Sequence, residues 1–129
     1  MQAVAEWESF LAWLISRHKE IKMAEDKAKE MLESNDPVGY RAHLQKKAEL
    51  VADLLKDSKP YVVALEPDLK DKVTGILKPF AMSAAYGLSL GSPFYWSALL
   101  YRDDHGKDEP DNLQCVITKM QDEGPDFVV

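Results

Sequence analysis

Residues 86–96, YGLSLGSPFYW, contain the first candidate for chemistry. The stretch Gly87-Leu88-Ser89-Leu90-Gly91 matches the G-x-S-x-G pattern in which serine hydrolases hold a nucleophile between a strand and a helix. Asp104 and His105 follow in the order that a triad requires. The residues before Ser89, however, have helical patterns that supply no parallel sheet, and only 40 residues remain after it. We therefore interpret both glycines as parts of a helix junction, and we predict no catalytic residue.

Two pairs of carboxylates on predicted helices suggest a different chemistry. Glu30/Glu33 and Glu49/Asp53 resemble the magnesium sites of all-α nucleotide pyrophosphatases, which carry an E-x-x-E helix facing an E-x-x-D helix. Here the second spacing is E-x-x-x-D, and the first pair closes a helix at its solvated end. The alternative functional hypothesis is therefore a magnesium-dependent all-α nucleotide hydrolase. The preferred hypothesis is a non-catalytic interaction protein.

Histidine and cysteine spacing argues against a resident metal. None of the three histidines follows a glutamate by three residues, and neither H-E-x-x-H nor C-x-x-C occurs. The acidic loop 103–111 does not fit an EF-hand, because placing Gly106 at the sixth position puts Tyr101 at the first. We predict no metal site, no cofactor and no small-molecule ligand. His18 is expected to pack in the core.

Composition indicates one folded domain. The chain has 129 residues, of which 46% are hydrophobic and 29% charged, as in globular proteins. Cys115 is the single cysteine, which excludes an internal disulfide and fits a reducing compartment. Met1 is followed by Glu6 and Glu8 without a basic region, so we expect no secretory leader and a cytoplasmic location.

The net charge is concentrated at one end. Residues 1–102 carry 14 acidic and 14 basic side chains, whereas residues 103–129 carry eight acidic and two basic ones, which gives the formal charge of −6. No basic stripe is available to neutralise phosphates. We therefore predict no nucleic-acid partner, and an acidic C-terminus.

The elements that position these residues begin with a long amphipathic helix. Apolar residues, with one arginine among them, recur at alternating three- and four-residue steps. They are Ala3, Trp7, Phe10, Leu14, Arg17, Ile21, Ala24, Ala28 and Met31. The segment SNDPVGY stops this helix and caps a second one, whose spacing runs to about Asp57. We predict an antiparallel helical hairpin over residues 3–57. Its charged residues, Glu25 and Lys29 among them, are expected to pair along a solvated face.

Proline and glycine divide residues 58–121 into shorter helices. Ser58 and Pro60 are expected to open one helix and Pro67 another, with Pro79 kinking or splitting it. Gly87 or Gly91 ends that helix, and Ser92-Pro93 opens the next. A polar loop and a last helix that stops at Gly124-Pro125 complete the pattern. The fold class is therefore all-α: a long hairpin packed on a compact group of shorter helices, with a tail at residues 122–129.

The uncharged segment 80–101 is long enough to suggest a membrane span. Its serines, glycines and tyrosines lower the mean hydropathy, and Pro93 and the glycines interrupt the helix. We therefore predict helices packed in the core of a soluble protein. That core is expected to hold Phe80, Phe94, Trp96 and Leu100.

The remaining candidates are interaction residues. PFYW places three large rings in succession, so at least one of Tyr95 and Trp96 is expected to be exposed or at an interface. The tail residues Phe127, Val128 and Val129 can pack back on the domain, add to a partner, or be disordered. We predict a non-catalytic interaction or assembly protein, of the kind of a phage-like or accessory factor. It acts through the hairpin seam or the Tyr95/Trp96 surface on a protein partner or on a second copy.

Overall fold

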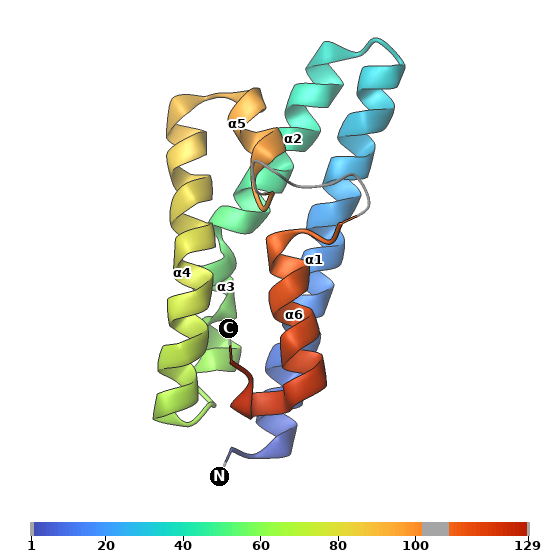
Figure 1. Cartoon of the computed structure of the whole chain (residues 1–129). Helices are drawn as coiled ribbons and strands as arrows, with labels where there is room; N and C mark the ends of the chain where they lie inside the picture. Colours follow the sequence, from blue (N-terminus) through green and yellow to red (C-terminus); the bar gives the residue numbers. More distant parts are fainter. Residues whose placement is uncertain (1, 102–108, 129) are drawn as a thin grey trace.

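The computed structural model describes residues 2–101 and 109–128, and all its regular elements are helices (Figure 1). The elements are α1 (Val4–Glu33), α2 (Pro37–Ala52), α3 (Leu54–Val62), α4 (Pro67–Leu90), α5 (Pro93–Ala98), α6 (Asn112–Glu123) and the 3-10 turn η1 (Gly124–Asp126). No strand occurs among the described residues, so the predicted all-α class is confirmed. None of the described helices is long and apolar enough to cross a membrane.

The predicted hairpin is formed by α1 and α2, which run side by side in opposite directions (Figure 1). Asn35 takes the left-handed conformation in the turn, and the Asp36 carboxylate accepts a hydrogen bond from the Gly39 amide at 2.9 Å. Pro37 occupies the first turn of α2, where no amide hydrogen is needed. The second arm continues past a break at Asp53 into α3.

The predicted apolar seam is buried from Trp7 to Ala28, whereas Ala3 at its start is exposed and Met31 at its end is half-buried. Trp7, Phe10, Leu14, Ile21, Ala24 and Ala28 all lie in the core. Arg17 fits into this seam because its guanidinium donates to the Leu50 carbonyl at 3.0 Å and pairs with Asp57 at 2.6 Å. The seam therefore joins α1 to both α2 and α3.

Two prolines that were expected to break helices lie inside them. Pro60 was expected to open a helix, but it lies in the last turn of α3. Pro79 was expected to kink or split a helix; the helix is not split there, since α4 continues through Pro79 as one element of 24 residues. The carbonyl that Pro79 leaves without its helical amide belongs to Gly75, which is exposed, so water can satisfy it.

The junction after α4 has the predicted form. Gly91 ends α4 with φ of 62°, and the Ser92 hydroxyl caps α5 by accepting from the Tyr95 amide at 3.2 Å. Gly87 is needed for a different reason. A Cβ at that position would lie 2.4 Å from Cδ1 of Tyr95. Both glycines therefore serve the helix junction, and the Ser89 hydroxyl between them donates to the Tyr86 carbonyl of its own helix.

The C-terminal segment packs back on the domain. Asp111 caps α6 by accepting from the Gln114 amide at 2.7 Å, and Gly124 ends the helix. Phe127 is then buried with its ring stacked on Trp7 at 5.9 Å. The Lys72 ammonium donates to the carbonyl of Phe127 at 2.7 Å, which ties the segment to α4.

Candidate functional site

The strongest concentration of buried charge lies where α1, α2 and the residues after α5 meet. Lys47 is fully buried, and its ammonium lies 2.7 Å from Oε2 of Glu25, which is also buried. The same ammonium donates to the carbonyl of Ser97 at 3.1 Å. This ion pair therefore links both arms of the hairpin to α5.

The second carboxylate oxygen of Glu25 has two more partners. Oε1 accepts from the Lys22 ammonium at 2.6 Å and from the Tyr101 hydroxyl at 2.7 Å. Lys22 also donates to the Tyr101 hydroxyl, at 2.9 Å. We call Lys22, Glu25, Lys47 and Tyr101 the charged cluster. It has two ammonium groups for one carboxylate.

Burial and charge shift the pKa of every member of the charged cluster. Burial alone would raise the pKa of Glu25, but the charges and hydrogen bonds of Lys47 and Lys22 lower it below its usual value. Burial lowers the pKa of Lys47, and the Glu25 charge opposes that shift. Burial would also lower the pKa of Lys22, yet its bonds to Glu25 and Tyr101 raise it. Burial raises the pKa of Tyr101 to about 12, so its hydroxyl stays protonated and donates to Glu25 at neutral pH.

A histidine–aspartate pair lies on the α6 side of α1. His18 Nε2 is 2.9 Å from Oδ2 of Asp111, and both side chains are buried. Burial would raise the pKa of Asp111, but the hydrogen bonds from His18 and the Gln114 amide lower it. His18 therefore packs in the core as predicted, and it joins α1 to the cap of α6.

The sequence analysis missed the charged cluster. Glu25 was expected to pair with Lys29 on a solvated face, but it is 7% exposed and pairs with Lys47. A signal was present: Lys47 lies three residues after Leu44 and four before Val51, within the apolar face of α2. Its burial shows that a charged residue at an apolar helical position can be a buried ion-pair partner.

A cavity of about 510 Å³ opens beside the charged cluster. We call it the charged cavity. Lys22, Glu25, Lys47 and Tyr101 line it, together with the charged residues Lys29 and Glu109 and with Ala28, Leu32, Tyr40, Leu44 and Ser97. It therefore has a polar end and an apolar wall.

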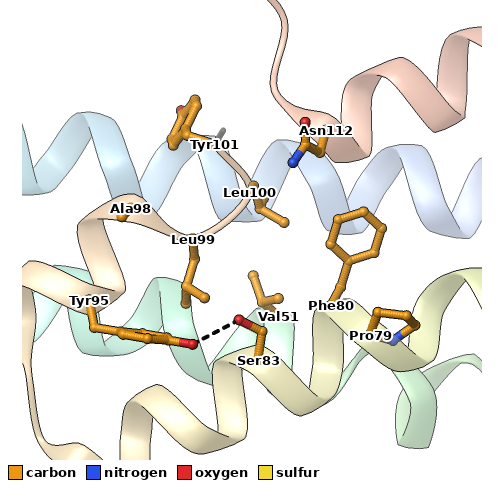
Figure 2. Close-up of a pocket in the computed structure, with 10 residues that line it drawn as sticks. All are labelled: Val51, Pro79, Phe80, Ser83, Tyr95, Ala98, Leu99, Leu100, Tyr101 and Asn112. Carbon is orange, nitrogen blue, oxygen red and sulfur yellow. Dashed lines mark hydrogen bonds between the residues drawn. The ribbon is translucent and has the colours of Figure 1, made fainter. Parts of the chain in front are cut away.

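A second cavity, of about 360 Å³, lies between α4, α5 and the start of α6 and is shown in Figure 2. We call it the α4–α5 cavity. Its walls are mainly apolar side chains, with hydroxyl and amide groups at the rim. The lining residues are Val51, Pro79, Phe80, Ser83, Tyr95, Ala98, Leu99, Leu100, Tyr101 and Asn112. The Ser83 and Tyr95 hydroxyls are hydrogen-bonded at 3.1 Å on one side, and the Asn112 amide lies on the other (Figure 2). Leu100 has φ of 75°, a strained conformation for a leucine.

An exposed apolar strip runs beside this cavity. Met82, Tyr86 and Leu90 recur every four residues on α4, and each is at least half exposed. Phe94 on α5 extends the strip and is 86% exposed. Its ring was expected in the core, and that prediction is wrong, because Trp96 fills the core position of this short helix. We call these four residues the α4 strip. Tyr95 links it to the α4–α5 cavity, since its ring contacts Tyr86 edge-on at 5.8 Å and lines the cavity.

The predicted interaction residues have mixed positions. Tyr95 is half-buried, whereas Trp96 and Phe127 are buried in the core and Val128 is exposed. Val129 lies outside the described residues, as do Asp103, Asp104 and His105. A role of these side chains in binding stays a prediction. In the monomer, the exposed ring of the PFYW segment is that of Phe94.

The carboxylate pairs of the alternative function do not form a cluster. Within residues 2–101 and 109–128 there is no group of three or more His, Cys, Asp or Glu side chains that could hold a metal ion. Glu30 is exposed and forms an ion pair with Lys27. No observation on the described part of the chain therefore favours a magnesium hydrolase.

No family model, curated protein or solved structure matches this chain. Function must therefore be argued from the geometry described above.

Proposed function

We propose that the chain is a non-catalytic interaction protein that binds another protein through the α4 strip and the adjoining α4–α5 cavity. The observation that supports this proposal is the exposure of Met82, Tyr86 and Leu90 at four-residue steps along one side of α4, together with that of Phe94 in the first turn of α5. Four large apolar side chains that are each half or more exposed present several hundred Å² of apolar surface, which is the size range of interaction sites.

The cavity beside the strip gives the surface a place for one inserted side chain. Phe80 and Tyr95 supply aromatic walls, and a volume of about 360 Å³ is ample for a leucine or an aromatic ring. Side chains buried in such pockets contribute most of the binding free energy in many interfaces. The partner is therefore expected to present one large apolar side chain.

The charges around the strip indicate the partner's other residues. The chain has no acidic residue between Asp71 and Asp103, and Lys78 is exposed one turn before Met82. At the other end, the Arg41 guanidinium lies 3.4 Å from the Gly91 carbonyl. A partner segment that carries acidic residues beside its apolar anchor fits this surface.

Photo-crosslinking tests the proposal. A photoreactive phenylalanine analogue at position 94 should yield a specific adduct in the cells that produce the protein, or a dimer when the partner is a second copy. The matched control position is Val4, which is 68% exposed on α1. Because Phe94 is so exposed, Phe94→Glu and Phe94→Lys should leave the fold intact. Phe94→Glu should weaken binding more than Phe94→Lys. Equal adducts from positions 94 and 4, or none from position 94, would refute the proposal.

A further inference from the structure

The lining of the charged cavity contains more positive charge than is needed to neutralise Glu25. At its polar end two ammonium groups, from Lys22 and Lys47, share the single carboxylate of Glu25. Lys29 and Glu109 also line the cavity, so its lining has three lysines against two glutamates. Among the described residues of the lining, positive charges therefore exceed negative ones by one when these groups are ionised.

Lys22 is the cation of the charged cluster that can meet a ligand. An ammonium has three N–H donors. Among the described residues, Lys22 uses two of them, on Glu25 and on the Tyr101 hydroxyl. Its side chain is 39% exposed, whereas that of Lys47 is fully buried. Lys47 is therefore enclosed with Glu25, whereas Lys22 keeps one N–H donor at the cavity surface that no described residue accepts from.

Farther along α1, the cavity lining includes apolar side chains. Ala28 and Leu32 lie on α1, one turn apart, and Leu44 lies on α2 across from them. Leu32 is 57% exposed, although it faces a cavity large enough to cover it with a bound molecule. A ligand that meets both ends must have an anionic group and a short hydrocarbon part.

The anion is better matched by a carboxylate than by a phosphate. The surplus of one positive charge among the described lining residues balances a monoanion, and none of those described residues is an arginine with the forked donors that favour phosphate. We propose that the charged cavity binds a small monocarboxylate with an apolar chain, whose carboxylate accepts from Lys22 and whose chain lies against Ala28, Leu32 and Leu44. This site is separate from the α4 strip, and it differs from the sequence-based expectation of no small-molecule ligand.

Calorimetric titration of the full chain with octanoate, and with octanol as the neutral probe of equal chain length, tests the site. Octanoate should bind with one-to-one stoichiometry and at least about tenfold more tightly than octanol, because the hydroxyl of octanol can accept from Lys22 but carries no negative charge to pair with its ammonium. Equal affinity for the two probes, or no octanoate binding, would overturn the proposal.

Variants locate the binding. Lys22→Met should weaken octanoate binding about tenfold or more while leaving octanol unchanged. Lys19→Met, at an exposed lysine on α1 outside the cavity, is the matched control and should change neither. Since Lys22 also contacts Glu25, a second variant is needed in case Lys22→Met unfolds. Leu32→Glu places a negative charge on the exposed wall and should also abolish octanoate binding. Octanoate affinity that is the same in Leu32→Glu as in the unsubstituted chain would overturn the site.

Discussion

Replacement of Lys47 by methionine tests the charged cluster most severely. The change keeps the length of the side chain but removes the fully buried ammonium that pairs with Glu25. Removing one member of a buried ion pair typically costs about 3–5 kcal/mol, because the other charge is left without its partner. Lys22 and Tyr101 remain bonded to Glu25 here, so the lower end, about 3 kcal/mol, is expected.

The assay is urea unfolding at neutral pH, compared with Lys27→Met as the control. Lys27 forms an exposed pair with Glu30 at 3.5 Å, and pairs of this kind contribute about 0–1 kcal/mol. The double variant Glu25→Leu/Lys47→Met removes both buried charges and should be more stable than Lys47→Met alone. A loss for Lys47→Met no larger than that for Lys27→Met would refute the reasoning. The reasoning would also be refuted if the loss of unfolding free energy in Glu25→Leu/Lys47→Met equalled the sum of the losses in Glu25→Leu and Lys47→Met.

Three further predictions concern stability. Gly87→Ala should destabilise the fold by about 1–3 kcal/mol through the clash with Tyr95. Gly75→Ala, with no atom within 4 Å of the new Cβ, should stabilise it by about 0.5–1 kcal/mol; urea midpoints of the two variants should therefore move in opposite directions. Phe127→Ala should cost about 3–5 kcal/mol, since the ring is 1% exposed, and a loss below about 1 kcal/mol in thermal or urea unfolding would show that the C-terminal segment is not packed in solution. The folded-state pKa of Glu25 is lowered from 4.5, so its contribution is present above that pH and is lost as the pH falls through the lowered value. Unfolding free energies measured between about pH 7 and pH 3 should therefore fall less steeply in Glu25→Gln than in the unsubstituted chain.

Sequence reasoning predicted the features that depend on local spacing and end signals. The apolar spacing of α1 and the Asp36-Pro37, Gly91 and Ser92-Pro93 signals are local, and each marks the element that the structure contains. The same approach failed at Pro60, which does not open a helix, and at Pro79, which does not split one. A helix with a missing hydrogen bond is stable when packing holds both sides of it and water reaches the freed carbonyl, and neither condition is visible in sequence.

The candidate sites were harder to predict, since they depend on which faces meet. Glu25 is buried because α2 places Lys47 against it, whereas the nearby Lys29 and Glu30 have no such partner and stay exposed. Similarly, α5 is only six residues long, so it can bury Trp96 but leaves Phe94 outside. Hydrophobicity alone does not distinguish these two rings. Only their position relative to α2 and α4 does.

Hydroxyl-radical footprinting tests most directly whether the α4 strip is a binding surface. In the purified chain at low concentration, Met82 and Phe94 should be oxidised rapidly and Phe127 slowly, in line with their exposure. In the cells that produce the protein, oxidation of Met82 and Phe94 should fall several-fold, while that of exposed Met23 on α1 should stay unchanged. Equal oxidation of the strip in the two settings would contradict the proposed function.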